Sequence, residues 1–311
     1  MKAVPIAFRP STPGDLPAII ELLKAAFEAP DGAPFLDPEL LHWKYFAPHP
    51  TWREPRGYVL DRDGELIAHG CVWPSTLPGP LQALCLIDWV SSKAMPGMGI
   101  MLARKLGQLG PVMLSIGGSE MTQAIMPKIG FVKQGELLTY ARVLRPWSQF
   151  LTRPGPRDRK AWLRLVRNAG WSLAGRAASD LTPKLVAPDP FLAGCPGAEI
   201  SAYDLFLLTQ VGGQSRIAQV RSSGNLEAVY SAAIQVARGN ELVALAHNAE
   251  AAIALEANGF RLRGRRSVFV MDHQKQLTQR QRLTQNDFPL PLTMLHDDMF
   301  YLNTPEYPYF T

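Results

Sequence analysis

Cysteine is scarce in this sequence of 311 residues, and its spacing excludes several classes of protein. Cys71, Cys85 and Cys195 are an odd number, lie far apart and stand mostly in apolar surroundings. They form no C-x-x-C pair of the kind that holds a metal, and no framework of a disulfide-stapled domain. We therefore expect no metal site and a reducing, cytoplasmic environment.

Long apolar runs are missing as well. No stretch of about 18 apolar residues, enough to cross a bilayer, occurs in the sequence. Its start, MKAVPIAFRPSTPGD, lacks the apolar core of a signal peptide. Hydrophobic residues make up 47% and charged residues 19%, as in ordinary globular proteins. We expect a soluble chain without a membrane span, long enough for two domains.

Acidic residues are few in two segments that carry much of the positive charge, and the net charge is +5. The first segment holds Arg153, Arg157, Arg159, Lys160, Arg164, Arg167 and Arg176 against Asp158, and the second holds Arg261, Arg263, Arg265 and Arg266. Such clusters could meet nucleic acid, an anionic membrane surface or an acidic substrate, or could form a solvated helix face and a strand edge. Because no nucleic-acid-binding motif accompanies them, we expect no nucleic-acid partner.

Apolar periodicity predicts the order of the elements. A helix over 16–27 has the i, i+3, i+4, i+7 spacing of one buried face, and a second helix is expected over 37–46. Apolar runs on both sides of a turn at 61–64 predict a hairpin. The elements expected next are a strand over 83–91, a helix over 99–109, a strand over 112–116, a short helix over 121–128 and strands over 131–143. This order is typical of a mixed α/β layer.

Glycine marks one junction in this order, the turn Pro96-Gly97-Met98-Gly99 between a strand and a helix. Glycines let backbone amides come close to a ligand, and the N-terminus of a helix offers unpaired N–H groups and the positive end of the helix dipole. Such a turn could hold the phosphates of a ligand, or it could only connect a strand to a helix.

Two motifs in this order resemble those of the GNAT acyltransferase superfamily, whose fold binds acetyl-CoA. The family's pyrophosphate loop, Gln/Arg-x-x-Gly-x-Gly/Ala, would fall on 94–99, with Ala94 in place of its first residue. The family's second motif, Asn-x-x-Ala-x-x-Leu-Tyr-x-Lys-x-Gly-Phe, has the spacing of 119–131. The residues of that motif that are intact here are Lys128, Gly130 and Phe131.

The second motif occurs twice, because residues 248–260 fit it again at an offset of 129 residues. The same offset relates Gly110 to Gly239 and the helix over 99–109 to residues 228–238. We therefore expect an α/β (mixed α+β sheet) chain of two GNAT-like folds in tandem, the second truncated. The predicted segments are an acyl-CoA-binding domain over 1–145, a basic, partly helical linker over 146–199 and a degenerate half over 200–311.

The two halves differ at the glycines of the turn. At the same offset, Gly97 becomes Leu226 and Gly99 becomes Ala228. The second half therefore lacks the residues that let phosphates approach, and we interpret the first half as the one that binds the cofactor. The apolar tail over 289–302 is expected to dock as a last strand or a lid.

The resemblance also implies which residues bind acetyl-CoA, or another acyl-CoA. The strand before the turn would face the pantetheine arm, the turn would bind the pyrophosphate, and polar positions of the second motif would bind the arm. The residues so implied are Val90, Ser91, Met95, Gly97, Met98, Gly99, Ile100, Ser119 and Thr122. Ser119 could instead cap the helix that follows it.

Asp88 is the candidate general base, because it is a lone carboxylate in the apolar strand ALCLIDWV, where the family often has an acidic base. Burial would raise its pKa, whereas a carboxylate paired with a neighbouring group is the structural alternative. His69, on the adjacent strand, is a reserve candidate for the base and a predicted substrate-binding residue, although a lone histidine on a strand is more often only packed. Trp43 and Tyr45 could shape the acceptor pocket, although core packing is the more common role of such aromatic residues.

The general acid is where the sequence departs from the family. The tyrosine of the second motif falls on Met126, and Pro127 is expected to kink the short helix. We expect an acyl-CoA-dependent N-acyltransferase that acts on an amine of a small-molecule or sugar-like acceptor. The alternative is a non-catalytic acyl-CoA sensor or interaction protein. A nucleic-acid binder would rest on the arginine clusters alone.

Overall fold

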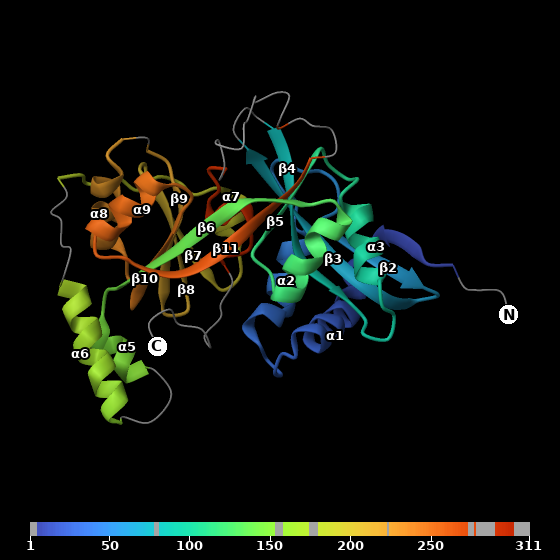
Figure 1. Ribbon diagram of the computed structural model, residues 1–311, viewed down its shortest axis with the longest axis horizontal. Helices are drawn as coiled ribbons and strands as arrows, with labels where there is room; N and C mark the ends of the chain where they lie inside the picture. Colours follow the sequence, from blue (N-terminus) through green and yellow to red (C-terminus); the bar gives the residue numbers. More distant parts are fainter. Residues whose placement is uncertain are drawn as a thin grey trace. The chain divides into compact units, whose positions relative to one another are not determined.

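The computed structural model describes residues 5–77, 81–152, 158–173, 180–222, 224–272, 277 and 290–301. Its chain forms two compact units, each with its own hydrophobic core (Figure 1). Unit 1 comprises Met1–Gly135, Gly194–Pro196 and Ser267–Leu290, and unit 2 comprises Glu136–Ala193, Gly197–Arg266 and Pro291–Thr311.

Unit 1 is a mixed sheet in the order β1-β2-β3-β4-β5-β11. Its elements are β1 (Ala7–Pro10), α1 (Leu16–Phe27), α2 (Pro38–Phe46), β2 (Gly57–Arg62), β3 (Glu65–Leu77), β4 (Leu81–Ser91), α3 (Met98–Leu106), β5 (Val112–Ile116), α4 (Glu120–Ile125) and the end of β11 (Arg261–Asp272). The pair β4 and β5 is parallel, and the other recorded strand pairs of this unit are antiparallel.

Local signals explain where these elements begin. Helix α2 starts after Asp37, whose carboxylate accepts hydrogen bonds from the amides of Glu39 (2.8 Å) and Leu40 (3.2 Å). The hairpin of β2 and β3 turns at Asp63 and Gly64, both with positive φ (55° and 86°), which is the backbone that suits the strand twist. The helix predicted over 16–27 is α1, with the same bounds.

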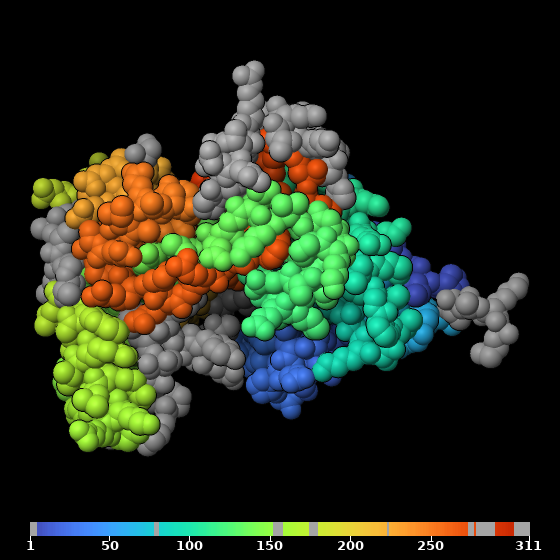
Figure 2. Space-filling model, in the orientation of Figure 1, coloured from blue at the N-terminus to red at the C-terminus, as the bar shows by residue number. Residues whose placement is uncertain are grey.

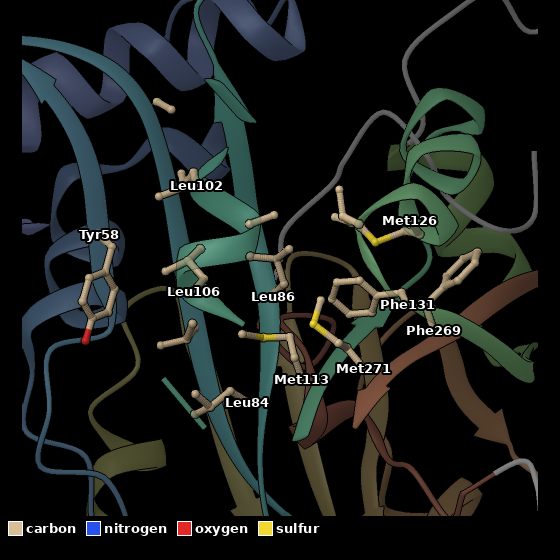
Figure 3. Close-up of a cluster of buried hydrophobic side chains, with 14 of the residues drawn as sticks. Tyr58, Leu84, Leu86, Leu102, Leu106, Met113, Met126, Phe131, Phe269 and Met271 are labelled. Carbon is tan, nitrogen blue, oxygen red and sulfur yellow. The ribbon is translucent and has the colours of Figure 1, made fainter. Parts of the chain in front are cut away.

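Helices cover both faces of the sheet in unit 1. A Cβ on Gly70 would lie 2.8 Å from Leu106 of α3, so β3 approaches α3 closely on one face. A Cβ on Gly57 would lie 3.5 Å from Cβ of Tyr45, so α2 covers the other face. Figure 3 shows the core beneath α3, where Leu102 and Leu106 point toward Leu86 of β4.

Unit 2 repeats this plan in the sheet order β7-β8-β9-β10-β6. Its elements are β6 (Val132–Val143), α5 (Pro146–Thr152), α6 (Arg159–Leu173), α7 (Pro190–Ala193), β7 (Ala198–Ala202), β8 (Phe206–Val211), β9 (Gln214–Val220), α8 (Leu226–Val236), β10 (Glu241–Ala246) and α9 (Ala249–Ala257). The strands β9 and β10 are parallel, like β4 and β5. The order β7-β8-β9-α8-β10-α9 thus matches β2-β3-β4-α3-β5-α4, as the sequence repeat predicts.

The strand that follows each copy of the second motif pairs with the sheet of the other half. Strand β6, which follows the first copy of the second motif, pairs antiparallel with β10 in unit 2. The end of β11, which follows the second copy, pairs antiparallel with β5 in unit 1. The sequence predicted strands over 131–143 but gave no sign of this exchange.

Of the tail predicted over 289–302, residues 290–301 are described, and from Pro291 they belong to unit 2, in an irregular conformation with a short turn at Met294–His296 rather than as a strand. The hydroxyl of Thr209 on β8 donates a 2.7 Å hydrogen bond to the carbonyl of Phe300, whose side chain is fully buried. In the described parts of the chain, no helix has the length and apolar character to cross a membrane.

The paired glycines Gly110 and Gly239 offer a test of this packing. A Cβ on Gly239 would lie 2.5 Å from the backbone nitrogen of Ser215, whereas one on Gly110 would meet the side chain of Leu84 at 2.9 Å. Because a side chain can move and a sheet backbone cannot, we expect Gly239→Ala to lower the free energy of unfolding by about 3 kcal/mol and Gly110→Ala by about 1 kcal/mol. Urea denaturation measures both, and equal losses would contradict the expectation.

Candidate functional site

The candidate site begins where β4 leaves β5. Their parallel pairing is recorded at Leu84 with Met113 and at Cys85 with Leu114, and goes no further. Strand β4 nevertheless continues to Ser91 on its partner β3. Within the described residues, the last part of β4 therefore has a strand neighbour on one edge only, and the backbone groups of its other edge are available to a ligand.

A β-bulge at Asp88 bends β4 at this point. Cys71 lies opposite Ile87 and His69 opposite Val90, so β4 has one residue more than β3 in this interval. Asp88 has a φ of 50°, in the left-handed region that costs a non-glycine residue about 1 kcal/mol or more. Surrounding contacts must hold this conformation.

A buried ion pair holds Asp88. The ammonium Nζ of Lys44 lies 2.7 Å from Oδ2 of Asp88, and the hydroxyl of Tyr45 donates a 2.6 Å hydrogen bond to the same oxygen. The side chain of Lys44 is 1% exposed and that of Asp88 is 10% exposed. Two consecutive residues of α2 thus fix the bulge of β4.

This pairing reverses the expected direction of the pKa of Asp88. Burial alone would raise that pKa, but the charge of Lys44 and the hydrogen bonds from Lys44 and Tyr45 outweigh burial and hold it below its ordinary value. Of the two alternatives for Asp88, the raised pKa is wrong and the pairing with a neighbouring group is confirmed, with Lys44 as the partner. Asp88 is an ionised, paired carboxylate at neutral pH.

The residues predicted to shape the acceptor pocket are buried. His69 has no exposed surface, and its ring packs edge-on against Tyr45 at 4.8 Å between centroids. Burial lowers the pKa of His69 to about 4, so its ring is neutral at pH 7. Trp43 is 7% exposed and packs on Trp73 at 5.7 Å. Binding of an acceptor by these residues stays a prediction.

The glycine turn begins α3 with an open first turn. Gly97 is the N-cap, with a φ of 87° and no side chain to accept hydrogen bonds from the helix. No atom lies within 4 Å of a Cβ built on Gly97. The amides of Gly99 and Ile100 find no acceptor in the described chain, as expected for the first turn of a helix. Four predicted residues, Gly97, Met98, Gly99 and Ile100, thus form one N-terminus.

Side chains from β4 hold this turn in place. The indole N–H of Trp89 donates a 2.8 Å hydrogen bond to the carbonyl of Gly99. A Cβ on Gly99 would lie 3.1 Å from Oγ of Ser91, so the second glycine permits a close approach to the end of β4. Met95 and Met98 pack against the core under α3. The turn therefore both connects β4 to α3 and presents free amides.

The polar residues of the second motif form a helix cap. Oγ of Ser119 accepts a 3.2 Å hydrogen bond from the amide of Thr122 at the start of α4, and the two hydroxyls are 3.1 Å apart. The capping alternative for Ser119 is therefore confirmed. Met126, at the position of the family's tyrosine, is 1% exposed and begins the 3-10 turn Met126–Ile129 that contains Pro127.

The matching helix in unit 2 is closed at its N-terminus. The side chain of Asn225 caps α8 by accepting a 3.2 Å hydrogen bond from the amide of Ala228. Leu226 occupies the position that corresponds to Gly97. The side chain of Asn225 thus binds one amide of the first turn of α8, whereas α3 has no side-chain cap.

Sequence reasoning missed the roles of Lys44 and Trp89. A weak signal existed for Lys44, since it stands three residues after Leu41 on a face of the predicted helix that carries apolar residues. Nothing in the local pattern indicated that Trp89 donates to the turn.

Comparisons with known proteins bear on the fold. No family model matches the sequence, and no curated protein matches it. A structure from Pyrococcus horikoshii, provisionally assigned as an acetyltransferase, is 12% identical with a TM-score of 0.55, over 86% of this chain and 90% of that one. A tandem GNAT protein from the clavulanic acid biosynthesis pathway is 12% identical with a TM-score of 0.54, over 86% of this chain and 98% of that one. This chain has the GNAT fold.

A GCN5-related N-acetyltransferase from Anabaena variabilis is similar too, at 11% identity and a TM-score of 0.51, over 86% of this chain and 72% of that one. At such identities the likeness concerns the fold. The predicted fold class, a mixed α/β chain with GNAT-like folds in tandem, is confirmed by these neighbours and by the repeated order of elements.

The ion pair between Lys44 and Asp88 predicts strong coupling. Lys44→Met or Asp88→Asn alone leaves a buried charge without its counter-charge, so each should lower the free energy of unfolding by about 3 kcal/mol. The double variant removes both charges, and its loss should be clearly smaller than the sum of the two single losses. Urea denaturation of the four proteins measures this coupling, and additive losses would mean that the pair does not hold the bulge.

The neutral His69 predicts a dependence of stability on pH. The folded protein does not protonate this ring until about pH 4, whereas the unfolded chain does so near its ordinary pKa of about 6.5. Its contribution is therefore complete above about pH 6.5 and declines by up to about 1.4 kcal/mol per pH unit below that.

His69→Gln removes this titration and keeps a polar side chain of similar size. Denaturation at about pH 7 and about pH 5 should give a smaller loss of unfolding free energy for the variant than for the parent, by about 2 kcal/mol. The same loss in both proteins would mean that folding does not lower the pKa of His69.

Proposed function

We propose that the chain is an acyl-CoA-dependent N-acyltransferase that binds acetyl-CoA in its predicted first half, residues 1–145, and acts on an amine of a small molecule. One observation carries this proposal: the free edge of β4 leads directly into a helix N-terminus whose amides are open. A thioester with a diphosphate at one end and a long polar arm fits these two features together.

The first turn of α3 suits a diphosphate. Gly97 brings no side chain, and the amides of Gly99 and Ile100 point out of the helix, at the positive end of its dipole. No acidic residue stands in this first turn. Binding here would rest on backbone groups, which explains why Ala94 can replace the first residue of the family's loop.

The free edge of β4 suits the pantetheine arm, which carries amide groups. The side chain of Val90 is 6% exposed, so Val90 would act through its backbone. Bound acyl-CoA would supply an activated acyl group. The part of the chain is then to hold that group at the bulge of β4 and to receive the amine beside it.

Asp88 is proposed as the group that receives a proton from the amine. Its Oδ2 is engaged by Lys44 and Tyr45, which leaves Oδ1 for this role. Its lowered pKa makes Asp88 a weak base, suited to amines that arrive neutral or of low basicity. Met126 cannot donate a proton, so solvent would protonate the leaving thiolate, and Asp88 would release the proton of the amine to solvent.

A non-catalytic acyl-CoA-binding protein is the second candidate. Two observations favour it: the apolar Met126 at the position of the family's acid, and the engagement of Asp88 in an ion pair. The two candidates share the cofactor site and differ in turnover. Release of free thiol from acetyl-CoA with a panel of small amines supports the enzyme, and binding without any thiol release supports the sensor.

The cofactor site is tested by placing a negative charge in the turn. Gly97→Glu should lower the affinity for acetyl-CoA by about 100-fold, because a carboxylate would stand beside the diphosphate. Titration calorimetry measures this affinity. Gly97→Asn controls for backbone strain, since asparagine tolerates a positive φ and adds no charge, and it should bind far better than the glutamate variant.

The matched control lies in unit 2. Leu226→Glu places the same charge at the corresponding position of α8 and should leave the affinity unchanged. Loss of binding in the Leu226 variant, or unchanged binding in Gly97→Glu, would assign the cofactor to the other half or to neither.

A further inference from the structure

Helix α6 of unit 2 carries three distinct stripes. Its buried stripe, Ala161, Leu165 and Asn168, has the i, i+4, i+7 spacing of a face packed on the unit. A second stripe is apolar but exposed, and a third is basic. The exposed apolar residues are Trp162, Leu163, Val166 and Leu173, and the basic ones are Lys160, Arg164 and Arg167.

The exposed apolar stripe is unusual for a helix of a globular protein. Trp162 is 48% exposed, Leu163 59%, Val166 68% and Leu173 66%. A hydrophobic face of this size in water has a free-energy cost that contact with an apolar phase would remove.

Helix α5 extends this apolar surface. Trp147, which is 58% exposed, lies edge-on to Trp162 at 6.2 Å between ring centroids. Phe150 lies 4.9 Å from the same ring. Two tryptophans and the three aliphatic side chains of α6 thus share the surface of α5 and α6, which is drawn in yellow-green in Figure 2.

The charge of this segment is strongly one-sided. The described residues 146–152 and 158–173 contain four basic side chains and one acidic, a net charge of +3. The single acid, Asp158, is used at the start of α6, where it accepts a 2.7 Å hydrogen bond from the amide of Ala161. The segment therefore favours an anionic partner.

Further arginines gather beside the basic stripe. Three guanidinium groups stand over the ring of Trp171, at 4.6 Å for Arg167, 5.2 Å for Arg263 and 5.9 Å for Arg261. Like charges repel at such distances, and a nearby anionic surface would relieve that repulsion. One arginine of the first basic cluster and two of the second thus meet at Trp171.

We infer that helices α5 (Pro146–Thr152) and α6 (Arg159–Leu173) dock unit 2 on the surface of an anionic phospholipid membrane. An exposed apolar stripe flanked by a basic one is what an in-plane amphipathic helix needs, and tryptophans favour the interface between headgroups and acyl chains. A second copy of the chain would bring the same positive charge and repel. The phosphates of nucleic acid would attract the arginines, but nucleic acid has no apolar phase that could bury the exposed aliphatic side chains.

Vesicle flotation of the full chain tests this inference. We expect binding to phosphatidylcholine vesicles that contain phosphatidylglycerol, weak binding to pure phosphatidylcholine, and weaker binding as salt is raised. Val166→Gln with Leu173→Gln should lower the affinity about tenfold, because both apolar side chains leave the acyl region. Arg164→Gln with Arg167→Gln should lower it by a similar factor on anionic vesicles only.

Ile253 provides the matched control. It is 67% exposed on α9 of the same unit, outside α5 and α6, so Ile253→Gln changes an equally exposed side chain and should leave binding unchanged. No binding to anionic vesicles, or equal losses in the Ile253 variant, overturns the inference. So does self-association or retention on DNA that the Val166 and Leu173 changes abolish. Docking through α5 and α6 does not depend on the proposed acyltransferase activity.

Discussion

The separation of β4 from β5 is the constraint on which the candidate site depends. Parallel pairing stops at Cys85 and Leu114, and a bulge at Asp88 then turns β4 toward the start of α3. A positive φ at Asp88 is unfavourable by itself, and the buried ammonium of Lys44 stabilises it from α2. A helix on one face of the sheet thereby shapes an edge that a ligand can use.

The two halves show how one fold can differ in a single turn. Both have a meander, a helix and a parallel strand in the same order. In α3 the N-cap is Gly97, and the first amides are open. In α8 the N-cap is Asn225, whose side chain takes one of them. The two helices thus differ in the cap at their N-terminus, within the same order of strands and helices.

The features that could be predicted from the sequence are those that local patterns determine. The helix over 16–27 and the strand over 112–116 were predicted to the residue, because apolar spacing and nearby turns determine them. The internal offset of 129 residues predicted the tandem fold. The exchange of β6 and β11 was missed, because pairing between distant strands leaves no mark on a local pattern. A paired Asp88 was one of two alternatives, but its partner was not identified for the same reason, since Lys44 is 44 residues away.

Amide hydrogen exchange with and without coenzyme A tests most directly whether the first turn of α3 holds a diphosphate. The account predicts slower exchange at residues 97–101 and along the free edge of β4, and no change at the N-terminus of α8. Unchanged exchange at α3 under conditions where coenzyme A binds, or protection at α8 instead, would contradict it.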